Sequence, residues 1–373
     1  MSPAVLHLIS SSGFYGAENM LLTLAKAQRC LGWRAVVGVF ENSGRPGGEM
    51  AVHARRAGLE VESVPCNGRI DLSVVGRLRK LIHGLDISVL HTHGYKADLY
   101  GYAAARGFPV RLISTCHNWT NETRALRLYA SLDRWILARF PLVAAVSPRV
   151  AGALRRAGVP ANRLRLIANG IDVERFRLAS GDLRGELARG GGPVIGMAGR
   201  LVPSKGFDDV IAVAPEVLSR APGATFALLG DGPHRAALEM LASKTNVANT
   251  FVFLGRRDDS ERFYASIDIF VLPSYNEGMP MTVLEAMAAG KPVIATRTGS
   301  IPNIVRHGET GLLYSPGDRK ALAAALAELA TDPGLARLMG TKGQEVAVRE
   351  HSAEAMARQY LGAYEELQDA TRG

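Results

Sequence analysis

The sequence predicts an α/β protein of two domains, each built around a parallel β-sheet. The chain has 373 residues, of which 47% are hydrophobic, so it is too long for one typical core and apolar enough to bury two. Short runs rich in Val, Ile and Leu alternate with longer amphipathic segments, a pattern typical of βαβ units. The segment 181–193 includes three consecutive glycines and has the composition of a flexible connection. We therefore predict domains at 1–180 and 181–350, followed by a C-terminal helical segment at 351–373.

Hydrophobic runs place the strands in order along the chain. We expect strands at 4–9, 35–40, 88–91, 111–115 and 142–146 in the first domain, and at 194–198, 225–229, 251–254, 269–272 and 293–295 in the second. The last helical pattern, at 351–367, begins with Ser352 as a candidate N-cap. No strand pattern follows it, so this helix could cover either domain.

The first predicted strand leads through a glycine-containing loop into an apolar helix at 20–27. Gly16 in this loop allows close approach of the backbone to a ligand, and the first turn of a helix offers N–H groups to a phosphate. Many α/β domains begin in this way, so the loop is a weak signal by itself. We expect Gly16 to close over the phosphates of a ligand that the second domain binds.

Three histidines follow two neighbouring strands of the first domain. His117 comes just after the strand at 111–115, at the strand's carboxyl end, where it can bind a sugar hydroxyl or a phosphate or transfer a proton. His91 and His93 end the preceding strand and could line the same site. Two histidines one residue apart could hold a metal, but no third ligand is obvious, so we predict no metal site and favour a structural role for this pair.

Two basic residues flank a turn near the start of the second domain. The segment 196–206 follows the first strand of that domain and leads into a helical pattern. Arg200 and Lys205 lie on either side of its turn, so both side chains can converge on one anion, for which a diphosphate is the natural candidate. Neither the dinucleotide glycine pattern nor the P-loop pattern is present, so neither NAD binding nor ATP hydrolysis is indicated. Because basic residues in a loop are more often solvated, the assignment of Arg200 and Lys205 to a diphosphate depends on the motif at 272–296, described next.

The segment 272–296 is the most informative, because it reads as a strand, a polar loop, a helix and another strand. Pro280 suits the first helical position and Gly290 the position just past the end. Between them only Thr282 and Glu285 are neither apolar nor small, so we expect the helix to be buried all round. A buried Glu285 needs specific hydrogen-bond donors, and the hydroxyls of a ribose are suitable ones.

The loop before this helix carries a second carboxylate. Glu277 lies at the carboxyl end of a strand, where open α/β sheets bind their ligands, and it can reach sugar hydroxyls. The backbone N–H groups of Gly278 and Met279, near a helix N-terminus, can face a phosphate. The alternative is a capping Glu with a structural ion pair, which leaves the sequence of the rest of the loop unexplained.

The formal net charge of +9 is concentrated in the first half of the chain, where residues 1–175 contain 23 Lys and Arg against 12 Asp and Glu. Such a surface attracts anionic lipid, nucleic acid or an acidic acceptor, and a solvated basic face is an equal alternative. No zinc-finger, RRM or helix-turn-helix pattern accompanies the charge, so we expect no nucleic acid. The segment 124–140 interleaves arginines with apolar residues and Trp135. It suits contact with an anionic membrane and a lipid-linked acceptor, although a helix packed on its sheet fits equally well.

Signals for secretion, membrane spanning or metal binding are missing from the sequence. No apolar run approaches about 20 residues and no signal-peptide pattern begins the chain, so we expect a cytoplasmic protein, with peripheral binding at the inner face of the membrane as an option. Cys30, Cys66 and Cys116 are widely spaced, so we expect free, buried or half-buried thiols. There is no Asp-x-Asp to hold a divalent ion under a nucleotide diphosphate. We therefore expect metal-independent chemistry without a cofactor, in which Arg200, Lys205 and helix N-termini supply the positive charge.

Taken together, these motifs resemble the family-4 retaining glycosyltransferases over nearly the whole chain. The family's Glu-x7-Glu motif matches Glu277 and Glu285, its diphosphate-binding Arg and Lys match Arg200 and Lys205, and a histidine of its acceptor domain matches His117. Its recurring landmarks match the segments 169–176, 230–233 and 308–313.

The resemblance implies the GT-B architecture, in which two Rossmann-like domains with parallel sheets face an interdomain cleft. The N-terminal domain would bind the acceptor, the C-terminal domain the nucleotide sugar, and the last helix would cross back to the N-terminal domain. One departure from the family is Tyr15, which precedes Gly16 where paired glycines are common. This side chain could narrow the donor-sugar pocket.

The activity that the resemblance implies is transfer of a hexosyl or N-acetylhexosaminyl group, with retained configuration, from a UDP- or GDP-sugar to an acceptor hydroxyl. Glu277 and His117 would act on the sugar, Arg200 and Lys205 on the diphosphate, and Glu285 on the ribose. The setting would be synthesis of a cell-surface glycan or glycolipid. An epimerase or hydrolase of the same fold and a non-catalytic nucleotide-sugar-binding protein are the alternatives. Base, sugar, acceptor and oligomeric state stay open.

Overall fold

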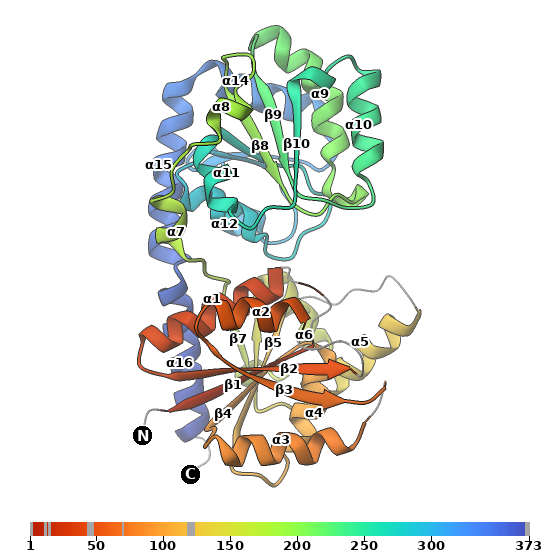
Figure 1. The fold of residues 1–373 in the computed structure, drawn as a ribbon, viewed down its shortest axis with the longest axis vertical. Coiled ribbons are helices and arrows are strands. Elements are labelled where there is room, and N and C mark those ends of the chain that lie inside the picture. Colours follow the sequence, from red (N-terminus) through yellow and green to blue (C-terminus); the bar gives the residue numbers. More distant parts are fainter. Residues whose placement is uncertain are drawn as a thin grey trace. The chain divides into compact units, whose positions relative to one another are not determined.

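The protein consists of two α/β units (Figure 1). The computed structural model describes residues 3–10, 13, 16–42, 48–68, 71–117 and 124–369. The first unit contains the chain up to Gly170 together with the residues from Ala353 on, and the second runs from Ile171 to Ser352. The chain thus passes from the first unit to the second at 170, about ten residues before the predicted boundary at 180, which the sequence pattern placed to within about ten residues. The glycine-rich segment lies in the second unit, where Gly190 and Gly192 pack so closely on Gly223 that a Cβ on either would lie under 3 Å from its backbone.

The first unit is built on a parallel sheet of seven strands in the order β3-β2-β1-β4-β5-β6-β7. Consecutive strands on each side of β1 are joined by helices, as the right-handed crossovers of a doubly wound sheet require. The strands are β1 (Ala4–Ile9), β2 (Arg34–Asn42), β3 (Glu60–Cys66), β4 (Val89–His93), β5 (Arg111–Cys116), β6 (Leu142–Ala145) and β7 (Leu164–Leu166).

Helices cover this sheet on both faces. On one face, apolar residues of α1, α2 and α16 share a core with the strands, and α16 contributes Met356, Tyr360 and Tyr364 to it. The C-terminal helix therefore packs on the first unit (Figure 1). The helices of the unit are α1 (Gly16–Cys30), α2 (Gly48–Arg56), α3 (Ser73–Gly84), α4 (Tyr95–Ala105), α5 (Arg124–Leu137), α6 (Pro148–Arg156) and α16 (Ala353–Asp369).

The second unit contains a parallel sheet of six strands in the order β10-β9-β8-β11-β12-β13. Two large apolar cores lie in this unit, one including residues of α9, α10 and α14 and the other residues of α7, α11 and α12. The strands are β8 (Val194–Ala198), β9 (Thr225–Leu229), β10 (Phe251–Gly255), β11 (Ile269–Leu272), β12 (Val293–Thr296) and β13 (Gly311–Tyr314). The helices are α7 (Val173–Arg177), α8 (Arg184–Leu187), α9 (Phe207–Arg220), α10 (Arg235–Lys244), α11 (Ser260–Ser266), α12 (Met281–Ala288), α13 (Ile301–Ile304), α14 (Arg319–Thr331) and α15 (Pro333–Glu350).

All ten predicted strands are present, within two residues at each end. Three further strands, β3, β7 and β13, were not predicted, because their sequences do not form clear hydrophobic runs. Strand β3 lies at the sheet edge and alternates polar residues with Val, β7 has three residues, and β13 has four. The expectation for the cysteines was wrong for Cys30, which is exposed at the end of α1, whereas Cys66 and Cys116 are buried. Among the described residues, we find no helix with the length and hydropathy required to span a bilayer.

Candidate functional site

In the second unit, the loop between β8 and α9 carries both predicted basic residues. Arg200 is exposed just after the end of β8, and Lys205 lies in the 3-10 turn Pro203–Lys205. Gly206 then adopts φ +68°, a left-handed conformation that starts α9, and a Cβ there would lie 2.3 Å from the carbonyl oxygen of Pro273. A glycine is therefore required where this loop passes over the loop that follows β11.

The β11–α12 loop is the predicted sugar-binding segment, and hydrogen bonds hold it from two sides. The Tyr275 N–H donates to the Ser204 carbonyl at 2.9 Å, which ties it to the basic loop. On the other side, the Ser300 hydroxyl and backbone N–H both donate to the Gly278 carbonyl, at 2.6 and 3.1 Å. These bonds fix the peptide between Gly278 and Met279 at the start of α12.

Lys205 and Glu277 form an ion pair across the two loops. The Lys205 Nζ lies 2.5 Å from the Glu277 Oε1, and the side chains are 21% and 10% exposed. From the sequence we expected the two residues to bind separate groups of a ligand, whereas in the structure they contact each other. Since a carboxylate next to an ammonium fixes its position and offsets its charge, Glu277 holds the Lys205 ammonium in place.

Helix α12 presents Glu285 from an otherwise apolar surface. All its residues except the half-buried Thr282 are buried, as predicted, and Pro280 is the N-cap rather than the first helical residue. Glu285 is buried, with 8% of the residue exposed. Burial raises the pKa of Glu285 above its ordinary value, while the neighbouring Tyr264 hydroxyl and the more distant Arg175 oppose the rise. A carboxylate held in this way is suited to receive hydroxyl donors from a ligand.

A cluster of hydrogen bonds around Asp209, which holds the β11–α12 loop through Tyr275, was not predicted from the sequence. The Tyr275 hydroxyl donates to Asp209 Oδ2 at 2.6 Å, and the Arg319 Nε donates to Asp209 Oδ1 at 2.8 Å. Asp209 is buried, and its carboxylate raises the pKa of Tyr275. The three residues come from a loop, α9 and α14, and no local pattern in the sequence links them.

In the first unit, His117 is half-buried directly after β5, and burial lowers its pKa to about 4. Gly16 is exposed at the first position of α1, where a Cβ would meet no atom within 4 Å. No described protein atom therefore requires a glycine at this position, and the expected approach of a phosphate to Gly16 stays a prediction. Tyr15 lies outside the described residues, as do the neighbours of His117 from 118 to 123.

The expectation that His91 and His93 lack a third histidine was wrong. His7 on β1 pairs in register with His91 on β4, and ring nitrogens of His7, His91 and His93 lie within 4.8 Å of one another. All three are buried, and each of their ring nitrogens is already hydrogen-bonded to a protein group. Such a set fits a hydrogen-bonded network better than a metal site, which needs ring nitrogens with available lone pairs.

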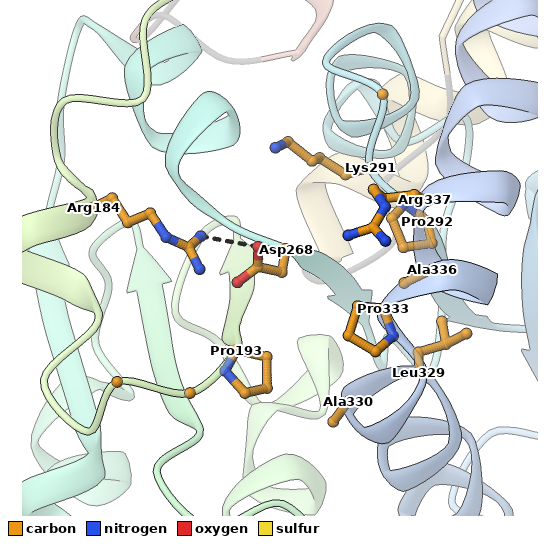
Figure 2. A pocket seen from close by; sticks show the side chains of 13 residues that line it. Arg184, Pro193, Asp268, Lys291, Pro292, Leu329, Ala330, Pro333, Ala336 and Arg337 are labelled. Carbon is orange, nitrogen blue, oxygen red and sulfur yellow. Dashed lines mark hydrogen bonds and ion pairs between the residues drawn. The ribbon is translucent and has the colours of Figure 1, made fainter.

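A separate pocket of about 560 Å³ lies at the amino ends of the strands of the second sheet, beside the residues that directly precede β8, β11 and β12 (Figure 2). Arg184 forms an ion pair with Asp268 at 2.9 Å there, and Lys291 and Arg337 also line it. Pro193, Pro292 and Pro333 form part of its wall. None of the predicted donor-binding residues lines this pocket, so it is distinct from the candidate site at the carboxyl ends of the strands.

Comparison with known proteins places this geometry among glycosyltransferases. The model of the family described as Glycosyltransferase Family 4 matches residues 14–175, and that described as Glycosyl transferases group 1 matches residues 192–332. A GDP-mannose-dependent alpha-(1-6)-phosphatidylinositol monomannoside mannosyltransferase of Mycobacterium tuberculosis is 32% identical over 307 residues, which cover 78% of this chain and 80% of the relative.

Two further comparisons extend the picture. An N-acetyl-alpha-D-glucosaminyl L-malate synthase of Bacillus anthracis is 26% identical over 79% of this chain and 78% of its own. Among solved structures, Anabaena Alr3699/HepE in complex with UDP has a TM-score of 0.85 at 24% identity, covering 98% of this chain and 100% of its own. This structural likeness supports the same fold, with two parallel-sheet α/β domains.

Proposed function

The chain belongs to the family-4, group 1 glycosyltransferases of GT-B fold, and on that premise we propose that it transfers a hexosyl or N-acetylhexosaminyl group from a UDP- or GDP-sugar to an acceptor hydroxyl with retained configuration. The observation that carries the proposal is the contact between the two predicted loops, with Lys205 bound to Glu277. A relative named for GDP-mannose and a structural neighbour with bound UDP support a nucleotide-diphosphate donor.

The donor diphosphate would bind to the basic loop. The exposed guanidinium of Arg200 and the ammonium of Lys205 can stabilise the negative charge that develops on the departing diphosphate. The backbone N–H groups of Gly278 and Met279 would add dipoles at the start of α12, where the hydrogen bonds of Ser300 to the Gly278 carbonyl orient the peptide that carries the Met279 N–H. Loss of one such group typically costs about 3 kcal/mol in the activation barrier.

The two glutamates would hold the rest of the donor. Glu285 would accept hydrogen bonds from the ribose hydroxyls. Glu277, whose position is fixed by Lys205, would orient the sugar, and His117 would contact the sugar or the acceptor hydroxyl. Departure of the diphosphate and attack by the acceptor on the same face of the sugar would retain its configuration. Catalysis on this proposal is mainly electrostatic positioning and requires no metal ion or cofactor.

We place the acceptor in cell-surface glycan or glycolipid synthesis, with peripheral binding to the inner face of the membrane through the basic first unit. Helix α5 supports this placement, because Trp135 and Leu132 are both exposed. The Arg139 guanidinium lies 3.6 Å from the centroid of the Trp135 ring, so an aromatic ring and a cation occupy one patch. Flotation with anionic liposomes at low salt tests this placement, and Trp135→Ser should reduce the bound fraction. Equal flotation of wild type and variant would contradict a role for α5.

The donor experiment begins with thermal unfolding in the presence of UDP-, GDP- and ADP-sugars, since a ligand that binds only the folded state raises its stability. The donor that stabilises most is then used in transfer and hydrolysis assays with product analysis. Arg200→Ala should lower the rate about 10²–10³-fold. Arg220→Ala, in which an exposed arginine of α9 is removed, is the matched control and should leave the rate unchanged.

The same measurements separate the alternatives. Sugar release or a changed sugar without acceptor product would favour a hydrolase or an epimerase. Tight donor binding without turnover would favour a non-catalytic binding protein. Full transfer by Arg200→Ala or Glu277→Ala would contradict the proposed site, and transfer that survives EDTA treatment is expected if no metal ion takes part.

A further inference from the structure

A chain of hydrogen bonds crosses the first unit from α1 to the candidate catalytic histidine. Gln28 on α1 contacts His7 on β1, with 2.7 Å between Oε1 and Nε2. The His7 Nδ1 lies 3.2 Å from the His93 Nε2, and the His93 Nδ1 lies 3.4 Å from the His117 Nε2. Gln28, His7 and His93 are buried, and only His117 is half-buried. The sequence places these residues far apart, and the strand order β1-β4-β5 brings their rings into a row.

The orientation of the Gln28 amide determines the position of every ring hydrogen in this chain. The Gln28 Nε2 faces the Tyr364 hydroxyl at 3.0 Å, and its Oε1 faces the His7 Nε2 at 2.7 Å. A carbonyl oxygen can only accept, so the His7 Nε2 carries the hydrogen and its Nδ1 accepts one from the His93 Nε2. By the same logic the His93 Nδ1 accepts a hydrogen bond from the His117 Nε2. The Nδ1 of His117 is then left with its lone pair.

Each ring in the chain carries a single hydrogen at neutral pH. Burial lowers the pKa of His7 to about 4, and the pKa of His93 falls well below its ordinary value through burial and the charges of His91, His7 and His117. The groups packed against the chain are the His91 ring, 4.3 Å from His93 between centroids, and the Tyr364 hydroxyl. A neutral imidazole has one donor and one acceptor, so fixing the first ring fixes all three.

A second branch of the network leads elsewhere. The Tyr364 hydroxyl also lies 2.7 Å from the His91 Nδ1, the His91 Nε2 lies 2.7 Å from the Thr115 hydroxyl, and that hydroxyl lies 2.9 Å from the Tyr360 hydroxyl. This branch ends on α16 and makes no hydrogen bond with His117. Tyr360 therefore offers a control in the same buried core.

We propose that Gln28 and His7 are positioning residues that act through His93 to fix the tautomer of His117, so that its Nδ1 accepts a hydrogen bond from a hydroxyl of the sugar or the acceptor. The contact with a substrate hydroxyl rests on the proposed function, whereas the tautomer does not. A ring fixed in the opposite tautomer would present an N–H group to the same hydroxyl, and it could not accept the proton of an attacking alcohol. The tautomer therefore decides whether His117 accepts or donates this hydrogen bond. Gln28 sets it through His7 and His93, without contacting the substrate.

The tautomer is tested without substrate by long-range ¹H–¹⁵N correlation spectra of the protein labelled in histidine. At pH 7.5 we expect His7, His93 and His117 each to carry hydrogen on Nε2. Gln28→Met, which removes the acceptor with little change in volume, should give His117 a mixture of tautomers. Gln28→Glu retains an acceptor and should keep His117 in the wild-type form. Hydrogen on the Nδ1 of His117 in the wild type, or an unchanged His117 in Gln28→Met, would overturn the proposal.

The catalytic consequence is tested by a double-mutant cycle on transfer, or on donor hydrolysis, with UDP-glucose and GDP-mannose as the probes. Gln28→Met should lower kcat about 10-fold. In a His117→Ala background the same change should lower it less than about 2-fold, because the residue through which it acts is gone. Tyr360→Phe should leave kcat within about 2-fold of wild type. An equal loss in both backgrounds would assign Gln28 a merely structural role and overturn the proposal.

The two arms distinguish failure of this proposal from failure of the proposed function. If the spectra show the expected tautomers but neither probe is turned over, the hydrogen-bonded chain stands and the assigned donors are wrong. If transfer is robust and the spectra show the opposite tautomer, the function stands and the positioning role falls.

Discussion

The ion pair of Lys205 and Glu277 provides the sharpest test of the site's construction. We predict that Lys205→Met and Glu277→Gln each destabilise the ligand-free second unit, and that the double variant recovers most of the loss. The reason is that each single change leaves one charge in a place where the side chains are only 21% and 10% exposed. Removing both charges leaves neither side chain with a charge that has lost this partner.

The magnitude follows from the geometry of the pair. A charge-assisted hydrogen bond contributes about 1.5–3 kcal/mol net, and breaking a fully buried pair costs about 3–5 kcal/mol. Since water reaches part of the Lys205 side chain, we expect about 2–3 kcal/mol for each single variant and a coupling energy of about 1.5–3 kcal/mol. In a unit of this size, that loss lowers Tm by about 4–12 °C.

The assay is chemical denaturation of the four proteins of the cycle, with unfolding followed by far-ultraviolet circular dichroism, because all three tryptophans lie outside the second unit. The exposed pair Arg220–Glu216 on α9, whose atoms are 3.0 Å apart, is the matched control, and its coupling should not exceed about 0.5 kcal/mol. If the effects of Lys205→Met and Glu277→Gln add within about 0.5 kcal/mol, the contact does not hold the two loops together. The reasoning about Glu277 as the group that positions Lys205 would then be wrong.

Three further predictions follow from single features of the fold. Gly206→Ala places a Cβ 2.3 Å from a carbonyl oxygen, at a residue with φ +68°, so it should lower the free energy of unfolding by at least about 2 kcal/mol and weaken nucleotide binding. In the control Gly185→Ala the new Cβ meets no atom within 4 Å, so the free energy of unfolding should not fall measurably. Burial raises the pKa of Glu285, so the folded protein loses stability as pH rises through that pKa and the carboxylate becomes charged. At pH 7.5, Glu285→Gln should therefore be at least as stable as wild type, while calorimetry should show UDP or GDP binding about 10-fold more weakly. A stable variant with unchanged affinity would contradict the ribose assignment. The pKa values of His7 and His117 fall to about 4 in the folded state, so the unfolded chain binds more protons between pH 6.5 and 4. Denaturation titrations should therefore show the free energy of unfolding falling, as the pH is lowered across this range, by up to about 1.4 kcal/mol per pH unit for each ring. A flat profile would show that these rings titrate normally.

Much of the second unit's architecture could be predicted because its signals are local. The boundaries of α12 depend on Pro280 and Gly290, whose backbone preferences act within one turn, and the structure moves the start by a single residue. The strands β8 and β11 are continuous apolar runs, as expected for strands buried on both faces. Arg200, Lys205 and Glu277 could be proposed because each lies in a loop that follows such a strand, and Glu285 because it is the one carboxylate in an apolar helix.

What the sequence could not supply are the contacts between distant segments. Lys205 and Glu277 are 72 positions apart, and Tyr275 and Asp209 are 66 apart, so no local periodicity connects them. His7 was overlooked for the same reason, since its alignment with His91 depends on β1 and β4 being neighbours in the sheet.

The sequence by itself determined which elements form and which polar residues end them, because hydrophobic period, turn chemistry and helix capping act over a few residues. Only the tertiary structure decided which of these residues meet. It turned two glutamates with separate predicted roles into one that is bound to Lys205 and one that is buried beside the Tyr264 hydroxyl. It also joined Gln28, His7, His93 and His117 into one chain, because strand order and register, rather than distance along the sequence, determine which side chains share a hydrogen bond.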